Sequence, residues 1–207
     1  GSSWSLSPTV YWSDGKFDIY AYYPRGTVNS VSEYSFRVKE DQSVPATASS
    51  AGAYEQSDLL LAKVTGVSRT ASVPLVFKHA LSKIVVKLEK GPEYEGDIPS
   101  DAAVYIHNTV PEALVDLESG DVVKAPHATS ATIKANKEAS GRYSAIIVPQ
   151  MLTSKLPLIE VVCGEVSYLV DLRFNFKSGV CHSISLSLDD NPERVSIEIG
   201  GELENWN

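Results

Sequence analysis

Apolar and polar residues alternate with a period of two along most of this chain, which is typical of half-buried β-strands. In residues 183–188 every even position is aliphatic and every odd position is serine, so the even face should be buried. Residues 166–172 alternate in the same way, and the odd positions of residues 195–199 are predicted to point inward. Residues 145–148 are apolar throughout, which predicts a strand covered on both faces.

One stretch changes its apolar parity. Between residues 75 and 88 the apolar side chains occupy odd positions as far as Leu81 and even positions from Ile84 onward. A strand cannot change its inward face without an extra residue. We therefore predict a β-bulge near residues 82–83, and a short helix over residues 78–83 is the alternative.

The chain is predicted to be almost entirely β-structure, because no apolar stripe of helical period is sustained over ten residues. Residues 112–118 are the nearest helix candidate, and residues 45–55 and 126–140 are expected to be loops. The predicted strands lie near residues 9–12, 17–23, 33–39, 59–64, 75–88, 103–107, 130–134, 143–148, 158–172 (divided at Gly164-Glu165) and 181–199 (divided at residues 189–192).

These strands suggest two parts, divided near the polar residues 68–72. We predict a partial N-terminal β-domain over residues 1–72 and a β-sandwich domain over residues 73–207. The first part has too few strands for a closed sandwich. It would leave an apolar face uncovered unless it docks on the second part or borrows a strand.

Charge and hydropathy exclude several classes of protein. The 207 residues contain 18 Lys and Arg against 26 Asp and Glu, a net charge of −8. An acidic chain without a basic run is a poor binder of nucleic acid or of an anionic membrane. The longest apolar run is about five residues, far short of the ~20 that a membrane-spanning helix needs.

The two cysteines, Cys163 and Cys181, leave two readings open. They could form a disulfide between neighbouring strands, or they could be two small buried side chains. Their spacing excludes a CxxC redox motif and a cysteine-rich zinc site.

No catalytic motif is recognisable, so we expect no enzymatic activity, no cofactor and no metal. The chain lacks GxSxG, P-loop, GxGxxG and HExxH patterns, and its four histidines are widely spaced. His79 is expected to be a core or edge residue. Asp189, Asp190 and Asn191 with Glu193 gather oxygen atoms that could hold calcium, but a solvated hairpin tip has the same composition.

Aromatic residues are concentrated near the start of the chain. Tyr11, Trp12, Tyr20 and Tyr22 form a candidate contact cluster, either a platform for sugar stacking or ordinary cross-strand packing. The dipeptide Asp14-Gly15 predicts a hairpin turn between residues 11–12 and residue 17.

Several short stretches occur in an order that resembles the fimbrillin-like family of Bacteroidales, which includes Mfa-like and FimA-like fimbrial subunits and cell-adhesion proteins. The resembling stretches cover nearly the whole chain and are residues 9–12, 17–24 (FDIYAYYP), 56–62 (QSDLLLA), 73–83 (VPLVFKHALSK), 147–150 (IVPQ) and the hairpin at 176–179. The resemblance implies two Greek-key β-sandwich domains of transthyretin-like type, with the N-terminal one reduced or truncated here.

The resemblance also implies a function. It implies export as a lipoprotein to the outer membrane and incorporation into a surface fimbria, where a neighbouring subunit donates a β-strand to a groove opened by cleavage after an arginine. The partners would be other fimbrial subunits, with a host or bacterial surface ligand as a further candidate. The alternative is a surface lipoprotein that binds a glycan or host ligand without polymerising.

This sequence departs from the family pattern near its start. Only eight residues precede Thr9, whereas family members carry the lipid-bearing cysteine and further strands there. We therefore expect either a truncated chain or a reduced N-terminal domain. No arginine precedes the first strand, so Arg25, in the turn after Pro24, is the candidate processing site.

Overall fold

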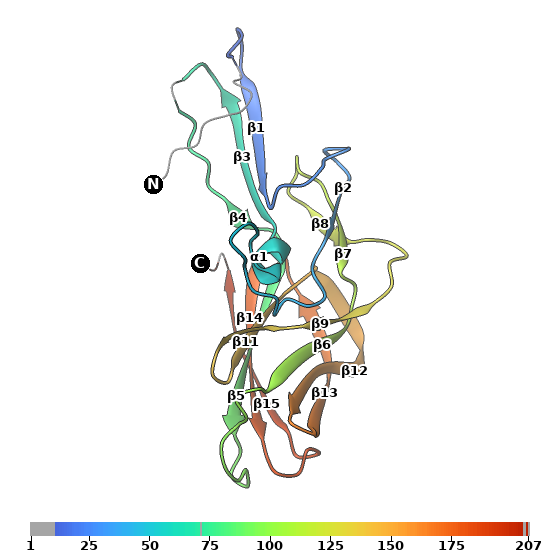
Figure 1. Cartoon of the computed structure of the whole chain (residues 1–207). Coiled ribbons are helices and arrows are strands. Elements are labelled where there is room, and N and C mark those ends of the chain that lie inside the picture. The colour runs from blue at the N-terminus through green and yellow to red at the C-terminus, as the bar shows by residue number, and fades with distance from the viewer. Residues whose placement is uncertain (1–10, 71, 205, 207) are drawn as a thin grey trace.

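The computed structural model describes residues 11–70, 72–204 and 206, and this part of the chain is built almost entirely of β-strands (Figure 1). Its largest sheet has five strands in the order β10-β11-β5-β14-β15, in which only β5 and β14 run parallel. The strands are β10 (Asn136–Ala139), β11 (Arg142–Ile147), β5 (Ser82–Lys90), β14 (Val180–Leu188) and β15 (Ser196–Glu204).

A second sheet packs against the first and completes a sandwich. It has four strands in the order β13-β12-β6-β9: β13 (Val166–Phe176), β12 (Gln150–Cys163), β6 (Ala103–Thr109) and β9 (Ala131–Lys134). Side chains from both sheets form one apolar core, which includes Ile84 and Ile184 from the first sheet and Ile106 and Ile159 from the second. The all-β sandwich class is therefore confirmed, and the strands divide at the predicted turns near residues 164–165 and 189–192.

A third, smaller sheet closes one end of this core. It has the order β2-β7-β8, with β2 (Tyr34–Arg37), β7 (Glu112–Val115) and β8 (Val122–Lys124). Tyr34 and Phe36 of β2 and Ala113 and Val115 of β7 are buried in the common core. Residues 112–118, the nearest helix candidate, contain strand β7 instead, with alternate residues buried, in line with the prediction of an almost entirely β chain.

The fourth sheet projects from the sandwich as an arm (Figure 1). Its strands are β1 (Phe17–Tyr23), β3 (Leu60–Val67) and β4 (Lys78–His79), in the order β1-β3-β4. The hairpin expected at Asp14-Gly15 is wrong, because residues 11–12 lie outside the strands and β1 pairs with β3. Strand pairs β3–β4 and β2–β7 join residues on both sides of position 72. The division into domains at this position stays a prediction.

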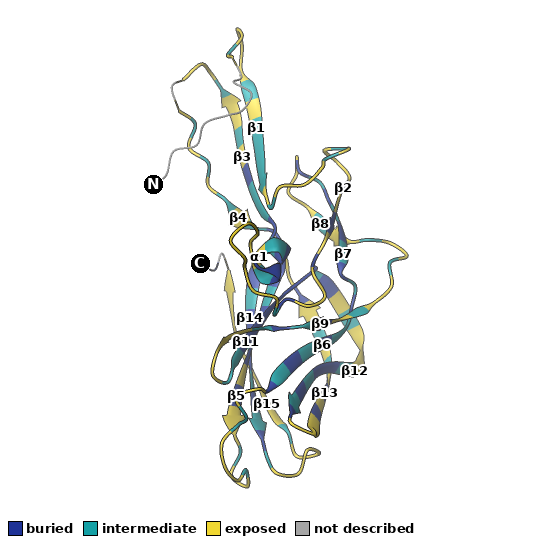
Figure 2. Ribbon diagram, in the orientation of Figure 1, coloured by how far each residue is buried: buried dark blue, intermediate teal, exposed yellow. Residues whose placement is uncertain are grey.

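Strand β11 is covered on both faces, as predicted for residues 145–148. One face lies on the sandwich core. The other face lies beneath the segment that carries the short helix α1 (Ala53–Ser57). Lys83 of β5 contacts this helix, and its ammonium lies 5.6 Å from the centre of the Tyr54 ring. Ala53 and Ser57, one turn apart, are the buried residues of α1, and Figure 2 shows this helix coloured partly as buried and partly as intermediate. The loop expected over residues 45–55 covers residues 45–52, and α1 begins at Ala53.

The parity change between Leu81 and Ile84 has a different cause from the one predicted. Neither a bulge nor a helix lies at residues 78–83. Instead the chain leaves the arm after β4 and enters the five-stranded sheet at β5, with Ala80 and Leu81 buried at the crossing. The two halves of the apparent strand belong to different sheets, so each keeps its own inward face.

Candidate functional site

The edge strand β15 is the most unusual part of the sandwich surface, because all nine of its residues are exposed. Ile199 lies opposite Ile184 and Ile197 opposite Leu186, and both β14 residues are fully buried. Cross-strand partners project from the same face of a sheet. Ile197 and Ile199 therefore lie on the core-facing side, yet they are 36% and 58% exposed. The expectation that residues 195–199 bury their odd positions is thus wrong for these two isoleucines.

The reason is that the opposing layer does not cover β15. The sandwich is open along this strand, and the backbone edge of β15 that faces away from β14 has no neighbouring strand among the described residues. A free edge is a template for strand pairing, and natural edge strands limit it by charge or by a bulge. Strand β15 has a bulge at Gly200-Gly201, so residues 196–199 form its regular stretch. We call Ile197, Ile199 and the unpaired edge of β15 the β15 seam.

Three contacts fasten the far end of β15. The Lys177 ammonium lies 2.6 Å from a carboxylate oxygen of Glu202, and Nδ1 of the buried His182 lies 3.6 Å from the other oxygen. Beyond the strand, the buried Trp206 ring stacks on His79 with 4.2 Å between the ring centres. The strand is therefore held at its C-terminal end while its apolar inner face stays open.

His79 is itself part of a small polar arrangement at the base of the arm. Its Nδ1 lies 2.8 Å from Oδ1 of Asp58 in a partly buried contact. The ring contacts this carboxylate through Nδ1 and Trp206 through its face. The structure thus places His79 at a sheet edge, in line with the expectation for this histidine.

His182 makes the stability of the sandwich sensitive to acid. Burial lowers the pKa of its imidazole, and Nε2 accepts a hydrogen bond from the backbone N–H of Lys177, which requires the neutral ring. The unfolded chain, with an ordinary pKa of about 6.5, therefore binds more protons than the folded chain in mild acid. The contribution of His182 to stability is therefore fully present above about pH 6.5 and falls as the pH drops below it.

We expect His182→Gln to reduce the difference in melting temperature between pH 7.5 and pH 5.0, because glutamine stays neutral and retains an acceptor. His127→Asn, at an exposed loop position with a positive φ of 64°, is the control and should leave the difference unchanged. Differential scanning calorimetry at the two pH values measures the effect. An unchanged difference in His182→Gln would contradict the assignment.

The arm is a single layer with apolar side chains on both faces. Of its strand residues only Ala62 is buried, and the other apolar residues of β1 and β3 are half-buried or exposed. The arm has no second layer of its own among the described residues, and the partial N-terminal domain over residues 1–72 stays a prediction.

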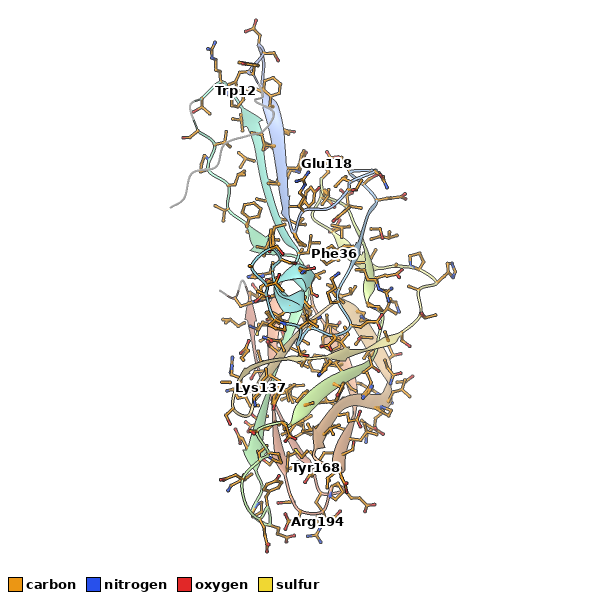
Figure 3. The ribbon with its side chains drawn as sticks, viewed as in Figure 1. Trp12, Phe36, Glu118, Lys137, Tyr168 and Arg194 are labelled. Atoms are coloured by element: carbon orange, nitrogen blue, oxygen red, sulfur yellow. The ribbon has the colours of Figure 1, made fainter. Side chains whose placement is uncertain are left out.

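The four residues of the predicted aromatic cluster have different neighbours. Trp12 contacts Phe17 edge-on at 5.7 Å, and Tyr22 packs on Tyr34 at 5.4 Å. Tyr20 lies 5.3 Å beneath the Lys63 ammonium, and Tyr11 is 85% exposed. Figure 3 places Trp12 near the tip of the arm, whereas Tyr22 joins the core at its base. A role of these residues in ligand contact stays a prediction.

The other predicted residues are located as follows. Arg25 is exposed in the connection between β1 and β2, and cleavage there stays a prediction. Cys163 on β12 and Cys181 on β14 are both free, and burial raises the pKa of each thiol.

The side chains of the acidic turn at residues 189–193 stabilise a neighbouring turn by accepting hydrogen bonds from its backbone. Asp189 and Asp190 accept hydrogen bonds from the backbone N–H groups of Glu93 and Glu95 at 3.1 and 3.0 Å. Within the described residues no cluster of three or more His, Cys, Asp or Glu side chains is arranged to hold a metal ion.

Comparison with known proteins places this architecture in context. The model of the fimbrillin-like family matches residues 1–206, and no curated protein matches significantly. A candidate cell adhesion protein from Bacteroides ovatus has 21% identity and a TM-score of 0.74 over 100% of this chain and 74% of its own. A second one, from Bacteroides uniformis, has 20% identity and a TM-score of 0.66 over 93% of this chain and 74% of its own.

The tip fimbrial protein Mfa3 from Porphyromonas gingivalis is similar at a TM-score of 0.51, with 7% identity over 85% of this chain and 71% of its own. At these identities the structural likenesses show a shared fold. Among the described residues no helix has the length and apolar character needed to cross a bilayer. The family match extends over almost every residue, and the chain therefore belongs to the fimbrillin-like family.

Proposed function

We propose that this protein is a structural or adhesive subunit of a cell-surface fimbria and that it assembles by β-strand donation between subunits. Membership of the fimbrillin-like family supports the fimbrial role and a location at the cell surface. Attachment to the outer membrane through a lipid anchor and a non-enzymatic role belong to the same proposal. The single observation that carries strand donation is the β15 seam.

The seam has the two properties that strand addition requires. Its free backbone edge offers N–H and C=O groups for a new antiparallel or parallel neighbour, which supplies affinity. Its inner face offers Ile197 and Ile199, which an alternating apolar strand would cover, and this supplies register. An incoming strand would therefore continue the five-stranded sheet and close the open side of the sandwich.

Substitution of Ile199 by lysine is the direct test. A charge on the inner face of the edge should weaken association of subunits about tenfold or more, because a donated strand would have to bury the ammonium. Val123→Lys is the matched control, since Val123 is also 58% exposed and lies on β8, outside the seam. Both variants and the parent chain are compared by sedimentation velocity over a range of protein concentrations.

The measurement is made on native protein before and after limited trypsin digestion at Arg25 or Arg69. Cleavage after Arg25 would separate β1 from the rest of the chain and free the edge of β3 in the arm, so the digested protein tests whether association requires processing as well as the β15 seam. We expect oligomers of the parent chain and of Val123→Lys, and their loss in Ile199→Lys. Strictly monomeric parent protein in both forms would refute strand donation. Equal disruption by the two lysine variants would show that association uses another surface.

A further inference from the structure

The outer face of the four-stranded sheet contains a polar hollow that has no part in the β15 seam. The hollow has a volume of about 400 Å³, within the range of small-ligand sites. Its lining comes from β6, β12, β13 and the start of β9 and includes His107, Asn108, Thr132, Pro157, Glu160 and Leu169. Its lining therefore combines hydroxyl, imidazole, amide and carboxylate groups with exposed apolar carbon.

Irregular strand pairing shapes this hollow. Between the pairs Ile106–Ile133 and Thr109–Ala131, strand β6 has two residues where β9 has one, so β6 contains a bulge. The bulge lets His107 point outward while Thr109 is buried, although both are odd positions. Bulges commonly re-aim side chains beside functional sites.

Asn108 stabilises the irregular backbone. It has a positive φ of 59°, which is uncommon for residues other than glycine and typical of asparagine when it occurs. Its side-chain amide donates a 2.7 Å hydrogen bond to the carbonyl oxygen of Pro157 on β12, where the pairing with β13 is also irregular. This hydrogen bond fixes the β6 side of the hollow to the β12 side.

A chain of hydrogen bonds crosses the hollow with one residue from each of the four strands. Thr132 Oγ1 lies 2.8 Å from Nδ1 of His107, and Nε2 of His107 lies 2.9 Å from Oε2 of Glu160. The Ser167 hydroxyl donates to the other carboxylate oxygen of Glu160 at 2.6 Å. The hydrogen bonds from Ser167 and His107 lower the pKa of Glu160, so its carboxylate is ionised and fixed in orientation at neutral pH.

The lining selects one class of ligand. Each carboxylate oxygen can accept more than one hydrogen bond, so Glu160 retains capacity for donors from a ligand. Leu169, half exposed beside it, offers an apolar surface. An anionic ligand is disfavoured, because the lining contains a carboxylate and neither lysine nor arginine. Both ring nitrogens of His107 are already engaged, which leaves none for a metal ion.

We infer that this hollow binds a neutral saccharide. A sugar ring presents hydroxyl donors along its rim, which suit Glu160 and Thr132, and patches of C–H groups, which suit Leu169 and Pro157. The site lies on the other sheet from the β15 seam, so it does not depend on the proposed assembly. It would give a subunit a contact with glycans whether or not the chain polymerises.

The test uses the full chain and saturation-transfer NMR with glucose, galactose, mannose, fucose, N-acetylglucosamine and glucosamine as probes. We expect transfer to at least one neutral sugar, with affinity measured by titration of backbone amide shifts. Glu160→Gln should weaken that affinity about tenfold or more, because hydrogen bonds to a charged acceptor are lost. Leu169→Ala should weaken it severalfold without touching the hydrogen-bond chain.

Glu165→Gln, in the exposed turn between β12 and β13, makes the same change of charge and should leave the affinity unchanged. Thr132→Val, which keeps the shape of the side chain, tests the hollow independently if Glu160→Gln unfolds. Ile199→Lys should bind sugar like the parent chain, which separates this inference from the assembly proposal. Absence of transfer to every neutral sugar, equal affinity in Glu160→Gln, or a preference for glucosamine over the neutral sugars would overturn the inference.

Discussion

Replacement of Gln42 by alanine is expected to lower the free energy of unfolding by about 3 kcal/mol. The side chain of Gln42 is fully buried. It donates to the carbonyl oxygen of Ile146 and accepts from the N–H of the same residue, both at 2.8 Å. Loss of a partner leaves a buried polar group unsatisfied at about 1–3 kcal/mol each. Two such groups on β11 would be left without a partner by this one substitution.

The Gln42 side chain makes the hydrogen bonds to β11 that a neighbouring strand would otherwise make. Strand β10 pairs with β11 only as far as Ser144. The Gln42 amide binds the same edge of β11 two residues further along, at Ile146. Gln42 also anchors its own segment, since its backbone N–H donates to the carbonyl oxygen of Lys134 at 3.0 Å. Alanine keeps this backbone bond but loses both side-chain bonds to Ile146, so the substitution should loosen the contact between β11 and the segment that carries α1.

Thermal unfolding measures the effect, and a loss of about 3 kcal/mol corresponds to roughly 6–12 °C for a chain of this size. Gln42→Met retains most of the volume without the hydrogen bonds and should lose most of the same stability. Gln56→Ala is the control, because the Gln56 amide bonds only to the exposed neighbours Ser50 and Ala51. If Gln42→Met were as stable as the parent chain, the hydrogen bonds would not be the cause.

Leu81→Ala is expected to lower the free energy of unfolding by about 2–5 kcal/mol, the usual range for a buried leucine. Leu81 is fully buried where the chain passes from the arm into the five-stranded sheet. Its carbonyl oxygen also accepts a 2.8 Å hydrogen bond from the N–H of Gly179, which fastens the turn between β13 and β14 to this crossing. A cavity here would weaken the joint between the arm and the sandwich.

Urea unfolding of Leu81→Ala and of Val76→Ala gives the comparison. Val76 lies on the same segment and is 73% exposed, so its truncation should cost little. A loss below about 1 kcal/mol for Leu81→Ala would mean that the crossing can collapse around the smaller side chain, contrary to our expectation.

Much of the fold could be predicted from the local pattern, because a strand with one buried face has apolar residues at alternate positions. Strand β14 alternates between buried and half-buried residues as predicted, and β11 is covered on both faces. The pattern was misleading for β15, where Ile197 alternates as if buried. Alternation reports which side of a strand is apolar, and it carries no information about whether another layer lies over that side.

The candidate sites depend on contacts that are distant in sequence. Thr132, His107 and Glu160 lie on three strands, and only the order β12-β6-β9 brings them within hydrogen-bond distance. Each residue alone is an ordinary polar residue on a strand. A bulge at residues 107–108 could not be foreseen either, because the buried Thr109 does not carry the apolar signal that marks an inward position.

The sequence by itself determined that this is an all-β protein with alternating strands, and its ordered motifs identified the fimbrillin-like family. Tertiary structure decided which strands share a sheet, where the chain crosses between sheets at Leu81, and which apolar edge stays open along β15. The physical reason is that alternation is a local property of the backbone, whereas coverage of a face depends on layers formed by residues far apart in the chain.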